Sequence, residues 1–290
     1  MFSTDDNQSI KLKNISLHRI RSFKCENNIT LGVSDCYCLI YSDQSLILYN
    51  IDGPVCHVSW QRDRFDCIQQ IRWSSYFRSF LIMTAENFFL FTLSNPQLYE
   101  LKIQTLNMQY FACDWIDLWL ISRSIHTKQQ YFYHRNLSNW KQNYQPNHYS
   151  LSQFGLHQAD LICAIECDLR GAFLALLIAE GNSIPTGNVS RARRLVIVDR
   201  LNLTSIHTIY FQKPNSLYWI ISSFIPWNHS QQGWLIAQSF DRQLTYLDHQ
   251  NPSETISLNY HDEIRNIAVS TNGQYLFIRT SNSIDIYPID

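Results

Sequence analysis

The chain has 290 residues, of which 45% are hydrophobic and 16% charged, and its formal net charge is −1. Such a composition excludes a disordered chain, because enough apolar surface is present to build a substantial core. With 23 basic against 24 acidic residues, no strongly basic surface is expected, and nucleic acid is not a predicted partner.

The N-terminal residues 1–9 are polar, and we expect them to form a disordered tail ahead of one domain over residues 10–290. They lack the basic and apolar regions of a secretory signal. The longest apolar run, Ala172–Ala179, is far shorter than the roughly 20 residues that cross a membrane. The sequence therefore predicts a cytoplasmic or nuclear protein without a membrane span.

A unit of three short strands recurs along the chain. The first unit begins near Ile29, with strands at Cys36–Tyr41 and Leu46–Tyr49. The second shows the pattern best, because its apolar runs are separated by hairpin-length turns. Its predicted strands are Ile68–Trp73, Phe80–Met83 and Phe88–Leu93.

Weaker copies of the unit start near Gln109, Leu161 and Leu217. Their predicted strands are Trp115–Ser122, Gln130–His134, Phe173–Ala179, Leu195–Asp199, Trp234–Ala237 and Leu244–Leu247. The sixth unit has strands at Ile264–Val269, Tyr275–Arg279 and Ile284–Tyr287. Its first turn contains Asn272 and Gly273, which both tolerate a positive φ.

The spacing of roughly 40 to 55 residues is the period of a four-stranded propeller blade. The fourth, outermost strands are predicted at His57–Trp60, Gln97–Ile103, Asn139–Tyr144, Ser205–Phe211 and Thr255–Leu258. The sixth unit has no residues left for one, so we expect Ile15–Ile20 to close the ring by completing the last blade. The predicted fold is all-β, a single propeller of six blades, with seven as the alternative count.

A β-sandwich, or two small β domains, is the competing architecture. The regular spacing without a linker favours a single ring. Helical periodicity is confined to a turn or two around Leu151–Leu156.

The last unit, from Ile264 to Asp290, resembles a WD40-type blade, and Ile68–Leu93 is similar to another. No unit ends in Trp-Asp and none opens with Gly-His, so the sequence departs from the family pattern at its most specific positions. The resemblance implies a rigid, non-catalytic platform for other proteins.

The eight cysteines are interpreted as reduced thiols. Cys36, Cys38, Cys67, Cys113, Cys163 and Cys167 all lie in apolar runs, where a thiol packs as a small hydrophobic group. Cys36 with Cys38, and Cys163 with Cys167, could each share one strand face, but no second pair follows at the distance that a zinc site needs. No phosphate-binding loop is present either. The sequence thus predicts no metal, no cofactor and no catalytic residues.

The clearest local charge feature is the group Arg191, Arg193 and Arg194, which follows a long loop over residues 181–189. Three arginines at the exit of an exposed loop can contact carboxylate or phosphate groups, which would favour an acidic or phosphorylated partner. The alternative is an ordinary solvated hairpin with flanking charges.

Trp73, Trp115 and Trp227 lie near the expected entrances of blades, where loops face the central channel, as does Trp60. Each is either a binding anchor at the channel or part of the packing between blades. The leading hypothesis is an intracellular scaffold that binds protein or peptide partners. The alternative is a propeller that binds or hydrolyses a small molecule or carbohydrate at its central channel.

Overall fold

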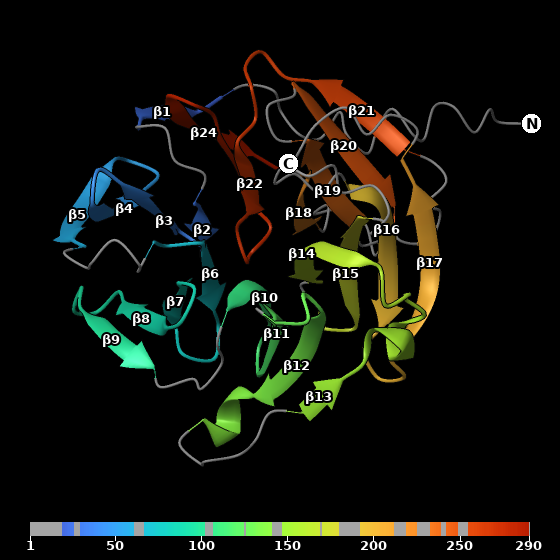
Figure 1. Cartoon of the computed structure of the whole chain (residues 1–290). Helices are drawn as coiled ribbons and strands as arrows, with labels where there is room; N and C mark the ends of the chain where they lie inside the picture. Colours follow the sequence, from blue (N-terminus) through green and yellow to red (C-terminus); the bar gives the residue numbers. More distant parts are fainter. Residues whose placement is uncertain are drawn as a thin grey trace, which may run out of the picture.

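The structure is a computed structural model in which the chain forms a ring of six β-sheets around a central channel (Figure 1). It describes residues 19–25, 30–60, 67–101, 107–124, 126–140, 147–168, 170–179, 192–211, 219–224, 233–238, 242–248 and 255–289. The predicted tail over residues 1–9 lies outside them.

Each sheet is a blade of four antiparallel strands that follow one another from the channel outward. Blade 1 contains β2 (Gly32–Val33), β3 (Tyr37–Ser42), β4 (Ser45–Asn50) and β5 (Pro54–Ser59). Blade 2 contains β6 (Gln70–Ser74), β7 (Ser79–Met83), β8 (Phe88–Thr92) and β9 (Leu98–Leu101). Blade 3 contains β10 (Met108–Cys113), β11 (Asp117–Arg123), β12 (Gln130–Asn136) and β13 (Asn147–Tyr149).

The second half of the ring repeats the arrangement. Blade 4 contains β14 (Leu161–Cys167), β15 (Phe173–Ala179), β16 (Ala192–Asp199) and β17 (Thr204–Tyr210). Blade 5 contains β18 (Trp219–Phe224), β19 (Gly233–Gln238), β20 (Gln243–Asp248) and β21 (Thr255–Asn259). Blade 6 contains β22 (Asn266–Val269), β23 (Tyr275–Arg279), β24 (Ser283–Pro288) and β1 (Arg21–Lys24). The predicted all-β propeller with six four-stranded blades is confirmed.

The hydrophobic core is divided into six clusters, one between each pair of neighbouring blades. The division follows from the alternation of side chains along a strand. In β7, Phe80 and Ile82 pack toward blade 1, whereas Leu81 and Met83 pack toward blade 3. All four are fully buried, and burying a side chain of this size contributes roughly 1.5 to 3 kcal/mol.

The N-terminal strand β1 closes the ring by pairing with β24. It starts at Arg21, so the predicted position of this strand, Ile15–Ile20, is wrong, although strand completion from the N-terminus is correct. An outer strand needs little apolar surface: Phe23 alone stacks on Tyr49 of blade 1, with ring centroids 5.1 Å apart. Position ahead of the first unit therefore predicts that an N-terminal strand closes the ring, but not the residues at which this strand begins.

A buried carboxylate secures the closing strand. Asp285 of β24 is fully buried and accepts hydrogen bonds from Tyr260 Oη at 2.6 Å and from Arg19 Nη1 at 3.2 Å. On the other side of the closure, the fully buried Arg279 donates to the carbonyl oxygen of Thr30 in blade 1. Removing the N-terminal segment would deprive Asp285 of a charged partner.

The outer strand of blade 3 also differs from its prediction at Asn139–Tyr144. Residues 137–139 form a 3₁₀ helix, η1 (Leu137–Asn139), residues 141–146 lie outside the described part of the chain, and the outer strand that pairs with β12 is β13, from Asn147. Leu137 is fully buried, and the Trp140 ring packs edge-on against Phe77 with centroids 5.7 Å apart. Tertiary packing of these apolar side chains thus overrides the strand pattern.

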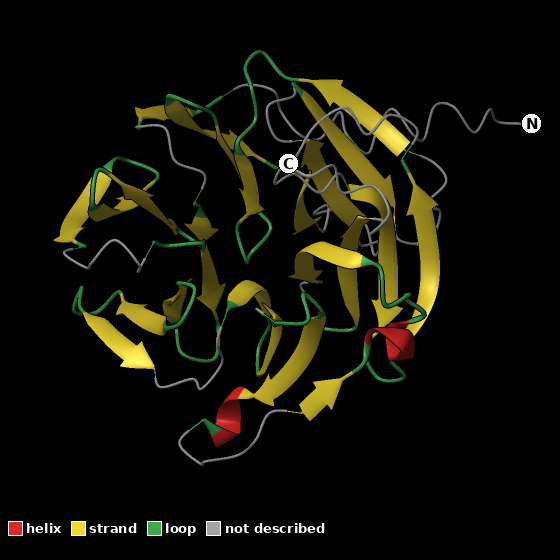
Figure 2. Cartoon of the chain, viewed as in Figure 1, coloured by secondary structure: helices red, strands yellow, loops and turns green. Residues whose placement is uncertain are grey.

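The described residues contain no α-helix, and their two short 3₁₀ helices are red in Figure 2. The second, η2 (Leu151–Phe154), confirms the helical turn expected around Leu151–Leu156. No helix among these residues has the length and apolar character to cross a membrane.

Candidate functional site

The antiparallel blades give the ring two distinct faces. Every inner strand runs toward the face formed by the turns β6–β7, β10–β11 and β16–β17 and their equivalents, which we call the Trp115 face. The opposite face is formed by turns such as β7–β8 and β11–β12, together with the connections between blades, and is called the Lys128 face. Each face gathers side chains that are far apart in the sequence.

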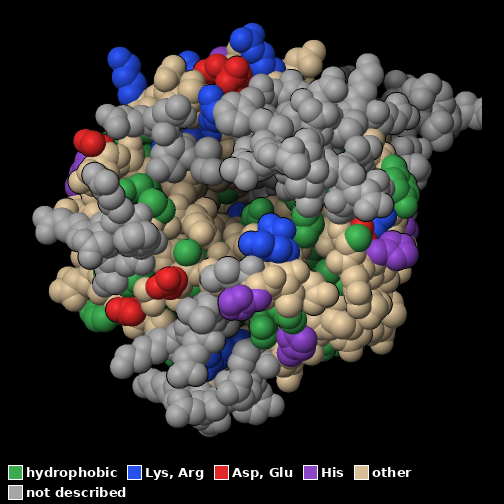
Figure 3. All heavy atoms as spheres, viewed as in Figure 1, with side chains coloured by type: hydrophobic (Ala, Val, Ile, Leu, Met, Phe, Trp, Pro, Cys, Tyr) green, Lys and Arg blue, Asp and Glu red, His purple; other side chains and the backbone are tan. Residues whose placement is uncertain are grey.

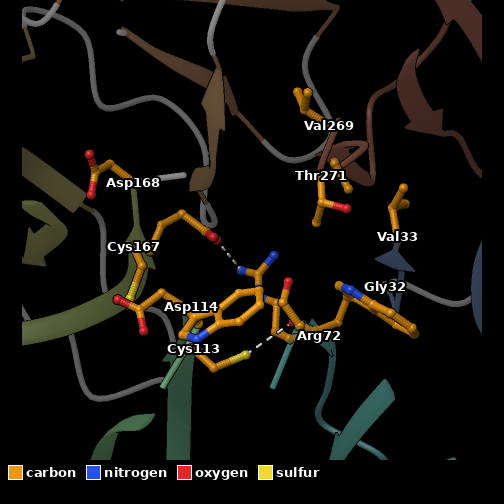
Figure 4. A pocket seen from close by; sticks show the side chains of 14 residues that line it. Gly32, Val33, Arg72, Cys113, Asp114, Cys167, Asp168, Val269 and Thr271 are labelled. Atoms are coloured by element: carbon orange, nitrogen blue, oxygen red, sulfur yellow. Dashed lines mark hydrogen bonds and ion pairs between the residues drawn. The ribbon is translucent and has the colours of Figure 1, made fainter. Parts of the chain in front are cut away.

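A cavity of about 170 Å³ lies in the central channel at the Trp115 face (Figure 4). Its lining comes from the inner strands or adjoining turns of blades 1, 2, 3, 4 and 6. The lining includes Arg72, Trp73, Cys113, Asp114, Trp115, Glu166, Asp168 and Thr271. The volume suits one inserted side chain rather than a folded element.

An ion pair crosses this cavity. Arg72 Nη2 of β6 lies 2.8 Å from Glu166 Oε2 of β14, so the contact joins blades 2 and 4 directly (Figure 4). Burial raises the pKa of the Glu166 carboxyl to about 6, and the nearby Arg72 opposes that shift. The channel is therefore occupied by a charged pair that the protein itself supplies.

A second charged network holds the β10–β11 turn, which carries Trp115. Arg200, from the β16–β17 turn of blade 4, donates to both Asp114 and Asp117 of blade 3. Asp114 Oδ1 in turn accepts from the backbone N–H groups of Ile116 at 3.1 Å and Asp117 at 2.9 Å. These bonds fix the turn from both sides.

Asp117 has a second side-chain contact, with His134 Nε2 at 2.9 Å. Burial alone would raise the pKa of the Asp117 carboxyl, but the hydrogen bonds and charges of His134 and Arg200 hold the pKa below its usual value. The carboxylate therefore stays ionised beneath the turn, where its attraction to Arg200 stabilises the contact between blades 3 and 4.

Exposed apolar side chains gather on the Trp115 face. Trp115 is 68% exposed and Leu201 is 93% exposed, and the turn residues Tyr76 and Ile116 are exposed as well. The other exposed large hydrophobic side chains lie on outer strands or directly before β1: Ile20, Val55, Tyr99, Ile206 and Tyr210. Among the described residues, no turn of the Lys128 face carries one.

Figure 3 shows one face of the molecule, on which the described hydrophobic side chains are scattered among polar and charged ones. Isolated apolar side chains of this kind are ordinary on a protein surface. An exposed tryptophan on a turn that two ion pairs hold is less ordinary, because the backbone that carries the ring is already ordered before a partner binds.

The predicted site residues do not form one group in the structure. Arg191 and Trp227 lie outside the described residues, and Arg193 belongs to β16. Arg194 Nη2 forms an internal ion pair with Asp160 Oδ2 at 2.5 Å and is largely buried. Trp73 is half-buried against Phe80, with ring centroids 5.1 Å apart, and also lines the channel cavity.

A role of these residues in partner binding stays a prediction. Trp115, at the cavity mouth, is the one whose surroundings match the expected anchor. Arg194 already has a carboxylate partner inside the protein.

The expectation that six cysteines pack in apolar strands is wrong for two of them. Cys36 lies exposed in the β2–β3 turn, and Cys67 lies exposed ahead of β6. Cys38 is buried, and burial raises the pKa of its thiol to about 12. None of the eight cysteines, all of which lie in the described ranges, forms a disulfide, and within those ranges no group of three His, Cys, Asp or Glu side chains could hold a metal ion.

Sequence reasoning missed the residues that organise the channel, which are Arg72, Glu166 and Arg200. Arg72 and Glu166 are single charges within the inner-strand segments Ile71–Trp73 and Ile165–Cys167. A lone charge between large side chains on a strand next to the channel is the signal that could have identified them. Arg200 gave no such signal, because turns often carry arginine.

Comparison with known proteins shows the fold only. A chain in the crystal structure of the mitotic checkpoint complex is 12% identical over 93% of this chain and 91% of its own length, with a TM-score of 0.63. A chain of Kuenenia stuttgartiensis hydrazine synthase is 8% identical over 90% of this chain and 84% of its own, with a TM-score of 0.61. No family model and no curated protein matches the sequence. The chain is therefore similar to propellers from a protein assembly and from an enzyme alike.

Proposed function

We propose that this protein is a non-catalytic, WD40-like scaffold that binds a protein partner on the Trp115 face. The observation that carries the proposal is the exposed Trp115 ring on a turn that Arg200, Asp114 and Asp117 hold in place. Tryptophan is among the side chains that most often dominate the binding energy of an interface once the partner covers them. A rigid turn avoids the entropic cost of ordering it on binding.

The neighbouring turns extend the apolar surface around this anchor. Tyr76 and Ile116 lie on the first turns of blades 2 and 3, and Leu201 lies beside Arg200 on the last turn of blade 4. The partner would therefore cover three consecutive blades. The similarity to a chain of the mitotic checkpoint complex agrees with a role in assembly, although at 12% identity it supports the fold alone.

The test is a comparison of two variants in proximity labelling or affinity purification from the native cell. Trp115→Ala removes the proposed anchor, and Tyr210→Ala is the matched control, because Tyr210 is 64% exposed on the outer strand β17. We expect Trp115→Ala to lose partners that Tyr210→Ala retains. Equal partner lists for both variants and the wild type would refute the proposal.

The alternative is a small-molecule or carbohydrate site in the channel. One observation favours it: Glu166 is a buried carboxyl group with a raised pKa inside a cavity, which is a common feature of catalytic sites. Against it, Arg72 already pairs with Glu166, and Asp114 already pairs with Arg200. Saturable binding of a sugar or metabolite that Glu166→Gln abolishes would favour the alternative.

A further inference from the structure

The Lys128 face contains a groove of opposite character to the Trp115 face. It has a volume of about 280 Å³ and lies where blades 2 and 3 meet. Its lining combines two cationic side chains with neutral polar and apolar ones: Gln69, Ala85, Asn107, Met108, Gln109, Arg123, Ser124 and Lys128. No carboxylate is among these residues.

Arg123 and Lys128 both belong to the β11–β12 turn region, where a hydrogen bond joins the Arg123 side chain to the Lys128 backbone. The Arg123 side chain donates from Nε to the Lys128 carbonyl oxygen at 3.0 Å, and the Lys128 N–H donates to the Ser124 carbonyl oxygen at 3.1 Å. Lys128 also adopts a left-handed backbone conformation, with φ of 59°, which is unfavourable for a residue with a Cβ atom. The turn therefore keeps two positive charges at one cavity.

Two like charges at one site repel each other unless an anion lies between them. Across the part of the chain that the structure describes, neither Arg123 nor Lys128 takes part in an ion pair. The surrounding amide groups of Gln69, Asn107 and Gln109 can add neutral hydrogen bonds. A planar guanidinium and an ammonium group that line the same groove suit a tetrahedral oxyanion that accepts from both.

We propose that the groove between blades 2 and 3 binds a phosphate monoester through Arg123 and Lys128. This site is independent of the partner surface on the Trp115 face. It also differs from the arginines at 191–194, because Arg194 already pairs with Asp160. The phosphate belongs either to a phosphorylated side chain of a protein or to a small free metabolite, and the two sources share the same recognition chemistry.

The experiment titrates the full chain with two probes, inorganic phosphate and a blocked alanine–phosphoserine–alanine tripeptide, and follows the phosphorus NMR signal. The test variant is Arg123→Gln/Lys128→Gln. The matched control, Arg78→Gln/Arg170→Gln, removes two exposed cations from turns of the Trp115 face and so changes the net charge equally.

We expect saturable binding of one phosphate per chain, at least tenfold weaker in the test variant and within twofold of wild type in the control variant. Tighter binding of the tripeptide than of inorganic phosphate would identify a modified protein as the source, and equal binding would identify a free phosphate. Equal losses in both double variants, or no saturable binding of either probe, would overturn the proposal. Coincident thermal melting curves of the variants and the wild type establish that the fold is intact.

Discussion

The two faces of the ring are built from the same kind of short turn, yet they present different chemistry. On the Trp115 face, apolar side chains are exposed while the charges beneath them are paired, as in Arg200 with Asp114. On the Lys128 face, no described turn exposes a large apolar side chain, and Arg123 and Lys128 line a groove without a carboxylate. Both faces share one set of blades, so the difference arises from turn sequences and not from the architecture.

The comparison shows where a propeller can place a binding residue. A turn supported by buried ion pairs can hold a large apolar ring away from the core. A turn supported by backbone and side-chain hydrogen bonds among its own residues, such as β11–β12, can hold charges that water solvates. Perturbing the support of each turn therefore tests whether the two faces are independent.

Opening the ring should have the largest effect and should disrupt both faces together. Deleting residues 1–24 removes β1 and Arg19, which leaves Asp285 without its guanidinium partner and exposes one edge of β24. We expect the free energy of unfolding to fall by about 4 kcal/mol or more, measured by urea denaturation. Deleting only residues 1–9 is the control and should be nearly neutral. A truncated chain that unfolds at the wild-type urea concentration would contradict closure by β1.

Removing the support of the Trp115 turn should affect only one face. Arg200→Met leaves Asp114 without its guanidinium partner and Asp117 with His134 alone. We expect a loss of about 3 kcal/mol in unfolding free energy, because breaking a buried ion pair leaves an uncompensated charge. On the other face, Arg123→Gln should change stability by less than about 0.5 kcal/mol. Similar losses for both variants would show that the faces are not supported differently.

The Glu166 carboxyl should give the Trp115 face a pH dependence. Because its pKa is raised to about 6 in the folded state from an ordinary value of 4.5, the folded state binds the proton more tightly than the unfolded state. The resulting stabilisation is present below pH 4.5 and is lost as the pH rises through 6. Relative to Glu166→Gln, the wild type should therefore lose about 2 kcal/mol of unfolding free energy between pH 4.5 and 7.5.

Urea denaturation of both proteins across that pH range measures this difference. Comparing the two removes the contribution of every other titrating group that they share. A difference that stays constant with pH would show that Glu166 is ionised in the folded protein at an ordinary pKa.

The two exposed cysteines provide the mildest test, because each reports on one face. Cys36 lies in a turn of the Trp115 face, and Cys67 lies in a connection on the Lys128 face. A thiol reagent should modify these two rapidly in the native protein and all eight only after denaturation. Replacing either with Ser should change stability by less than about 0.5 kcal/mol. A partner on the Trp115 face should protect Cys36 and not Cys67, and protection of Cys67 alone would place the partner on the opposite face.

The blade repeat was predictable because it depends on local alternation and turn chemistry, which Phe80–Met83 and Asn272-Gly273 display directly. The outer strands were less predictable. They carry few apolar residues, so β1 and β13 were misplaced by several positions while the inner strands were found. Outer-strand position is decided by contacts such as Phe23 with Tyr49, which join residues distant in sequence.

The candidate site was predictable only in part. Trp115 could be identified from its place at the start of a predicted strand, but Arg200, which holds its turn, is far along the chain. The sequence shows where a charge lies but not whether another side chain pairs with it. For this reason Arg194 was predicted to be available to a binding partner, and Arg123 was overlooked. Asp160 pairs with the first, and no described carboxylate pairs with the second.

The ion pair between Arg72 and Glu166 has a mechanical consequence. It links blades 2 and 4 across blade 3, while Gln70 reaches Phe111 and Gln130 reaches Ile162 between adjacent blades of the same arc. Blades 2, 3 and 4 are thus joined both by contacts between adjacent blades and by a direct contact between blades 2 and 4. In thermal fluctuations this arc should deform as one stiff segment, so that the ring bends elsewhere along its perimeter and the surface around Trp115 keeps its shape.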